Sequence, residues 1–160
     1  MTFAPLAVLR ALTEAGVRFV LIGGLAGREH GSTTVTNDVD VCYDRAPDNL
    51  ERLAGALRAM HARLRGVDEE VPFVLDARTL PNGDSFTFET DHGSVDVLAT
   101  PSGTSGYADL AAAAEPVSYG DFSVLVVALD DLIRMKRAAA RPKDRVEVEV
   151  LLALRDEARG

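Results

Sequence analysis

Three aspartates on strand-like segments constrain this chain more than any other feature. Asp38 and Asp40 form a D-x-D pair and Asp96 follows much later, each flanked by valines or other apolar residues. Because successive side chains of a strand point to opposite faces, Asp38 and Asp40 share one face, with Cα atoms roughly 6 to 7 Å apart. Carboxylates that converge on a half-buried sheet repel one another and raise each other's pKa unless a cation neutralises them. The pattern therefore predicts a divalent metal site built on a sheet.

A pair of glycines follows the strand that precedes the D-x-D segment. The apolar run over residues 18–22 predicts a buried strand, and Gly23 and Gly24 lie between it and a short helix expected over residues 25–30. Glycines let a phosphate approach the backbone closely, and free N–H groups at a helix start can hold an anion. A tight turn is the alternative interpretation. Neither the dinucleotide-binding G-x-G-x-x-G pattern nor the P-loop pattern occurs.

Hydrophobic periodicity predicts an α/β domain with a mixed β-sheet flanked by helices. Longer helices are expected over residues 3–15, 47–65, 129–140 and 142–158, and a short one ending near residue 114. Strands are expected over 18–22, 38–43, 71–75 and 122–127, with a hairpin formed by 85–90 and 94–98. The hairpin requires an antiparallel pair, so the sheet is mixed. A chain of 160 residues is expected to be one domain, residues 1–160.

Charge and apolar content exclude several classes of protein. The formal net charge of −8 argues against general DNA or RNA binding, although residues 134–145 carry six basic side chains and one acid. That run is either a solvated helix face or a local binding site. The apolar stretches are too short to cross a bilayer, and the first residues lack a secretory signal. With a single cysteine, Cys42, which fits a reducing compartment, the chain is expected to be cytoplasmic and not membrane-associated.

Lys136 and Arg28 are the candidate phosphate-binding cations. On a helical projection of residues 129–140, Lys136 lies at the centre of the apolar stripe. Its stem either extends along the core to reach water or points its amine into an active cleft, where it would bind a triphosphate. Arg28 lies one turn into the helix that follows the glycines, and the alternative for it is a solvated side chain.

The glycine pair after a strand, the D-x-D strand and the later lone aspartate together resemble the minimal nucleotidyltransferases of the DNA polymerase β superfamily. The resemblance covers nearly the whole chain. Residues 90–98, 132–136 and 141–144 also resemble small bacterial proteins related to the AbiEii-type toxins of toxin–antitoxin pairs. The resemblance implies a polymerase β-like nucleotidyltransferase fold in which Asp38, Asp40 and Asp96 bind two Mg²⁺ or Mn²⁺ ions. The third carboxylate joins one metal near the acceptor hydroxyl.

One departure from the family pattern concerns phosphate binding. The usual Gly-Ser after the first strand is Gly23-Gly24 here. The phosphate contact made by that serine must therefore come from the backbone, from Ser32 or from a cation.

The activity implied by the resemblance is transfer of NMP from an NTP to an acceptor hydroxyl, with release of pyrophosphate. The expected acceptor is a tRNA end or a protein hydroxyl, and the toxin resemblance adds an antitoxin as a partner. An aminoglycoside or other small molecule is an alternative acceptor, but such family members usually add a helical domain for which this chain has little room. A non-catalytic nucleotide-binding or interaction module is the alternative from another class. Three clustered carboxylates argue against it, because they are costly to retain without a cation.

Overall fold

The computed structural model describes residues 3–65 and 85–159, and the elements named here belong to those residues. The strands are β1 (Phe19–Ile22), β2 (Asp38–Tyr43), β3 (Arg63–Leu64), β4 (Ser85–Thr90), β5 (Gly93–Leu98), β6 (Glu115–Ser118) and β7 (Ser123–Val126). The helices are α1 (Pro5–Glu14), α2 (Gly23–Glu29), α3 (Pro47–Ala59), α4 (Tyr107–Ala111), α5 (Leu129–Ala139) and α6 (Pro142–Arg159). None of the described helices has the length and apolarity to span a membrane.

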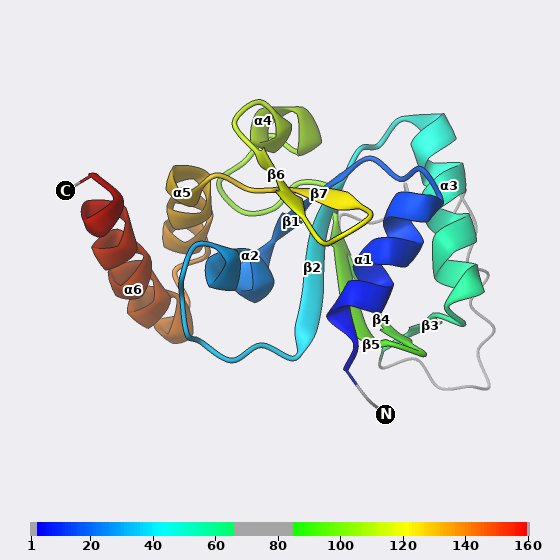
Figure 1. Ribbon diagram of the computed structural model, residues 1–160, viewed down its shortest axis with the longest axis horizontal. Coiled ribbons are helices and arrows are strands. Elements are labelled where there is room, and N and C mark those ends of the chain that lie inside the picture. Colours follow the sequence, from blue (N-terminus) through cyan, green and yellow to red (C-terminus); the bar gives the residue numbers. More distant parts are fainter. Residues whose placement is uncertain (1–2, 66–84, 160) are drawn as a thin grey trace.

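The described strands form one mixed sheet in the order β3-β4-β5-β2-β1-β7-β6. The pairs β2–β5 and β1–β7 are parallel, and the remaining neighbours are antiparallel. Figure 1 shows α1 and α3 on one side of the sheet and α2, α5 and α6 on the other. The predicted fold class, a mixed sheet flanked by helices, is confirmed.

One predicted helix ends earlier than expected, one observed strand has no counterpart in the prediction, and one predicted strand lies outside the described residues. The helix expected over residues 47–65 ends at Ala59, because His61 takes a positive φ of 55° and the chain then pairs with β4 as the short strand β3. Strand β6 was not expected. It contains Pro116, which lacks a backbone N–H and is tolerated here because β6 lies at the sheet edge. The strand expected over 71–75 falls among residues that the structure does not describe.

Alternation along β2 and β5 separates the core from the polar face of the sheet. Val39, Val41, Val95 and Val97 are fully buried. Alternation places them on the face opposite Asp38, Asp40 and Asp96, which line a cavity with residues of α5 and α6. Leucines of α1 and α3 complete this part of the core: Leu9, Leu12, Leu53 and Leu57. The residues between the valines therefore face the opposite side, toward α2, α5 and α6.

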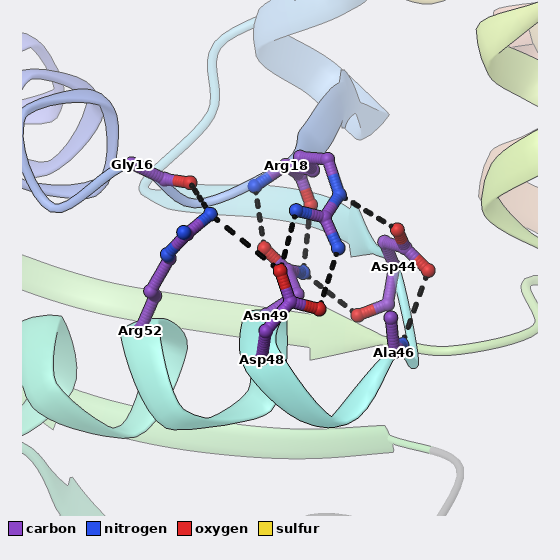
Figure 2. A network of polar contacts seen from close by, with 7 residues as sticks. All are labelled: Gly16, Arg18, Asp44, Ala46, Asp48, Asn49 and Arg52. Carbon is purple, nitrogen blue, oxygen red and sulfur yellow. Dashed lines mark hydrogen bonds and ion pairs between the residues drawn. The ribbon is translucent and has the colours of Figure 1, made fainter.

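A polar network joins the start of α3 to the chain just before β1 and just after β2 (Figure 2). The fully buried Asn49 accepts a hydrogen bond from the Arg18 backbone N–H at 2.7 Å. Its amide group donates to the carbonyl oxygens of Arg18, at 3.1 Å, and Asp44, at 2.7 Å. The Arg18 guanidinium adds ion pairs to Asp44 and Asp48. Because the network fixes both strands at one end, it supports the β1–β2 register in which Ile22 lies opposite Asp40.

We expect Asn49→Ala to lower the free energy of unfolding by about 2 to 3 kcal/mol, because it leaves buried backbone groups without partners. The control is Asp48→Ala at the preceding position, which removes two exposed ion pairs, to Arg18 and Arg52, and should change stability much less. Urea unfolding of both variants measures the difference. Equal midpoints would show that the buried amide contributes no more than the exposed carboxylate.

Candidate functional site

Strand register brings the three predicted carboxylates to one pocket. Asp40 is directly opposite Asp96 in the parallel β2–β5 pair, and Asp38 is opposite Ser94. All three aspartates line a cavity of about 450 Å³ between this face of the sheet and the helices α5 and α6. Of the other residues predicted to form the site, Gly23, Gly24 and Lys136 line the same cavity, whereas Arg28 and Ser32 do not.

Asp40 has the most strongly perturbed acid–base behaviour in the pocket. Its burial, the hydrogen bond and negative charge of Asp96, and the charge of Asp38 raise its pKa to about 8. The positive charge of Lys136 acts in the opposite direction. Asp40 therefore holds a proton near neutral pH in the absence of a cation, as expected for one of two adjacent carboxylates.

Asp96 and Asp38 differ in how their oxygens are satisfied. The Oδ1 atom of Asp96 is buried and has no hydrogen-bond partner among the described residues. Asp38 has a side chain that is 39% exposed, and its Oδ1 lies 3.9 Å from the Arg65 guanidinium. In residues 3–65 and 85–159, no three His, Cys, Asp or Glu side chains are arranged as a metal cluster. The three aspartates therefore lie on neighbouring strand positions in one pocket, but their side-chain oxygens are not arranged around a single point as metal ligands would be.

The chemistry of these groups nevertheless fits a hard cation. Carboxylate oxygens are preferred ligands of Mg²⁺. A bound cation would also give the buried Asp96 Oδ1, which accepts no hydrogen bond from the described residues, a favourable electrostatic partner. A cation would also remove the repulsion that keeps Asp40 protonated beside Asp96.

Close contacts within the protein require glycine at both positions after β1. A Cβ atom on Gly23 would lie 2.0 Å from Oδ2 of Asp40, and Gly23 also has a positive φ of 70°. A Cβ on Gly24 would lie 2.8 Å from the side chain of Thr36. Glycine at these positions lets the Asp40 carboxylate and the segment before β2 pack against the backbone that opens α2.

The wall formed by α5 and α6 carries positive charge around a buried acid. Asp144 is 1% exposed, and Lys136 Nζ lies 3.5 Å from it. Arg141 donates to Asp144 from its Nε atom at 2.7 Å and from its backbone N–H at 3.1 Å. Burial alone would raise the pKa of Asp144, but these hydrogen bonds and the charges of Arg141 and Lys136 hold it below its ordinary value. Lys136 therefore faces the cleft as a charged side chain paired with a carboxylate.

Sequence reasoning missed the acids of α6. Its buried residues are Asp144, Glu147, Val148 and Leu151, the spacing of one apolar helix stripe. Two acids on such a stripe are the same kind of signal that identified Lys136. Arg28 and Ser32 instead hold the loop that leads to β2. Arg28 donates to the Thr34 carbonyl at 3.2 Å, and Ser32, itself in the loop, donates to Glu147 of α6 at 3.1 Å.

Comparisons with known proteins identify the fold. The chain matches no protein-family model and no curated protein sequence. It is similar to the lincosamide antibiotic adenylyltransferase LnuA in its lincomycin-bound crystal structure, with TM-score 0.62, 12% identity and coverage of 93% of this chain and 94% of that one. The proposed nucleotidyltransferase TM1012 of Thermotoga maritima gives TM-score 0.55, 15% identity and coverage of 95% and 92%. The antibiotic-resistance factor ANT(2'')-Ia gives TM-score 0.52 and 15% identity, with coverage of 95% of this chain and 89% of that one. The chain has the polymerase β-like nucleotidyltransferase fold.

Proposed function

We propose that the protein is a metal-dependent nucleotidyltransferase that moves NMP from an NTP to an acceptor hydroxyl and releases pyrophosphate. The observation that carries this proposal is the pairing of Asp40 with Asp96 in one pocket, beside Asp38 and opposite Lys136. The fold is shared with nucleotidyltransferases. A non-catalytic module with this fold would not need the repelling carboxylates at its centre.

Each part of the pocket has a proposed role. Asp38, Asp40 and Asp96 would hold Mg²⁺ or Mn²⁺, which when bound neutralises phosphate charge and favours ionisation of the attacking hydroxyl. Lys136 binds the triphosphate as a point charge, and the backbone at Gly23 and Gly24 allows close approach of a phosphate. Arg28 and Ser32, expected from the sequence to contact phosphate directly, lie outside the lining and act through the loop they hold.

The basic residues favour an anionic acceptor such as a tRNA end. Arg141 and Lys143 line the main cavity, and Arg137 and Arg145 line a neighbouring hollow of about 310 Å³ that shares Lys136 with it. These basic side chains lie in two adjacent hollows of an otherwise acidic chain, where Asp144, Glu147 and Glu149 offset part of their charge. A protein hydroxyl as acceptor, a role as the toxin of a toxin–antitoxin pair, an antitoxin partner and a cytoplasmic location stay predictions from the sequence.

A small-molecule acceptor is the second candidate, and one comparison favours it. LnuA, named as an antibiotic adenylyltransferase, is matched over 94% of its chain by 93% of this one. A small-molecule acceptor therefore stays an alternative to the anionic acceptor, because a protein of this name is matched over nearly its whole length.

Magnesium or manganese should raise the melting temperature, as a ligand selective for the folded state does. The increase should grow between pH 6 and pH 8, because the metal must displace the proton that Asp40, with a pKa of about 8, holds in the folded protein. Without metal, stability should fall over the same range, since the folded-state pKa is raised and the stabilising proton is lost as pH rises through it. Scanning calorimetry with and without metal measures both trends.

The control for metal binding is the double variant Asp38→Asn and Asp40→Asn, which should fold and show no metal-induced increase. A matched pair of exposed aspartates, Asp130 and Asp156, changed in the same way should keep it. A full increase in the Asp38/Asp40 variant would place the metal elsewhere.

Lys136→Met should weaken NTP binding by roughly tenfold or more, the loss of about 1.4 kcal/mol expected for one charge-assisted contact. Met keeps the packing of the stem, and Arg141 still neutralises Asp144, so the free energy of unfolding should fall by no more than about 1 to 2 kcal/mol. Titration calorimetry with Mg²⁺ and a non-hydrolysable NTP measures the affinity. Lys143→Met, at the exposed edge of the same pocket, is the control. Equal affinities in the two variants would remove Lys136 from the triphosphate site.

Incubation with an α-labelled NTP and Mg²⁺ should transfer label to tRNA in preference to protein or an aminoglycoside. RNA binding should weaken steeply with salt, and Arg137→Ala with Lys143→Ala should reduce the salt slope because two phosphate contacts are lost. Label on lincomycin or an aminoglycoside alone would select the small-molecule alternative. Absence of transfer to any acceptor, with NTP binding intact, would favour the non-catalytic module.

A further inference from the structure

One wall of the pocket is a loop held by a buried acid of α6. Residues 31–37, here named the pocket loop, connect α2 to β2, and Thr34, Val35 and Thr36 within it line the cavity. Glu147, 8% exposed, accepts hydrogen bonds from the hydroxyl of Ser32 at 3.1 Å and of Thr34 at 2.6 Å. The carboxylate therefore joins α6 to the pocket loop at two points.

The pocket loop leads directly into the candidate metal site. The Thr34 backbone N–H donates to the Ser32 hydroxyl at 3.2 Å, so one of the two side chains bound by Glu147 also holds the backbone of the other residue. Two residues further on, the Thr36 hydroxyl accepts a hydrogen bond from the backbone N–H of Asp38 at 3.4 Å. A displacement of the pocket loop would consequently be felt at the first aspartate and at the surface facing a bound nucleotide.

Glu147 has little freedom to move and no cationic partner. A Cβ atom on Gly27 would lie 3.2 Å from its Oε1, so α2 packs closely over the carboxylate. Among the described residues no lysine, arginine or histidine forms an ion pair with it, in contrast to Asp144 one turn earlier. Burying a carboxylate on hydroxyl partners alone costs stability compared with an apolar side chain on the same stripe. A neutral residue would serve a purely structural helix contact better.

We propose that Glu147 is a positioning residue that latches the pocket loop, so that Thr34, Val35 and Thr36 form a fixed wall against the bound nucleotide. This inference rests on the proposed nucleotidyltransferase function. Glu147 lines the cavity from α6, across from the strands that carry the aspartates. Its two carboxylate oxygens accept from the hydroxyls of Ser32 and Thr34, and its action passes through them. The latch serves nucleotide affinity rather than the reaction at Asp40 and Asp96.

The test combines hydrogen exchange with nucleotide binding in Glu147→Ala. Amide exchange at Thr34 should become faster, because Ser32 and Thr34 lose their common acceptor. The Kd of Mg²⁺ with a non-hydrolysable NTP, and the KM for NTP, should rise roughly tenfold, while kcat changes less than threefold. Glu147→Gln should recover part of the affinity, since its amide oxygen accepts one of the two hydrogen bonds. Glu157→Ala, an exposed glutamate of the same helix, should match wild type in every measurement.

Two results would overturn the latch, and both are distinct from failure of the proposed function. Unchanged exchange at Thr34 in Glu147→Ala would show that Glu147 does not hold the loop. Faster exchange with wild-type nucleotide affinity would show that the held loop does not position the nucleotide. If Glu147→Ala does not fold, Thr34→Val removes one arm of the latch at an exposed position and must shift Kd in the same direction. Wild-type protein that binds no nucleotide would refute the proposed function itself, and the nucleotide role of the latch with it.

Discussion

The close approach of the Asp40 carboxylate to the Gly23 backbone is the constraint on which the rest of the site depends. No side chain fits at Gly23, because its Cβ would overlap Oδ2 of Asp40. That contact exists only in the register that sets Ile22 opposite Asp40 and Asp40 opposite Asp96. The register is held at one end by the buried Asn49 network and along its length by buried valines. Packing on the apolar face of the sheet thus fixes the register, and the register sets how close Asp40 lies to Asp96 on the polar face.

The sheet carboxylates were predictable from the sequence because strand alternation is a strong and local rule. Asp38 and Asp40 share a face by spacing alone, and a lone Asp96 between valines must lie on the polar face of its own strand. The direct pairing of Asp40 with Asp96 was not predictable, because register across a parallel pair depends on the whole crossover between the strands. The orientation of the Asp38 side chain toward Arg65 depends on the end of α3, which the sequence placed several residues too late.

Helix α6 shows where a rule was available but was applied unevenly. A charged residue on an apolar stripe identified Lys136, and the same criterion applied to residues 142–159 would have identified Asp144 and Glu147. What each acid binds could not be read from the chain. Asp144 gains two cations from the end of α5 and the start of α6, whereas Glu147 gains two hydroxyls from a loop more than a hundred residues away. Helix propensity and hydrophobic periodicity in the sequence predict which face of a helix a residue occupies. Which group it binds depends on tertiary contacts between distant segments.

The opposite pKa shifts of Asp40 and Asp144 describe the ligand that the pocket suits. Asp40 is surrounded by acids and holds a proton, so that side of the cavity favours added positive charge. Asp144 is surrounded by Lys136 and Arg141 and stays ionised, and the cations it orders leave the helix wall favourable to added negative charge. A free phosphate would meet repulsion at the sheet, whereas a metal ion bound to the aspartates would leave the cations of the helix wall without an added anion. A divalent metal bound to a triphosphate presents both charges in the required order across one cavity. The two walls of the cavity therefore favour charges of opposite sign, which is the electrostatic basis of the proposed function.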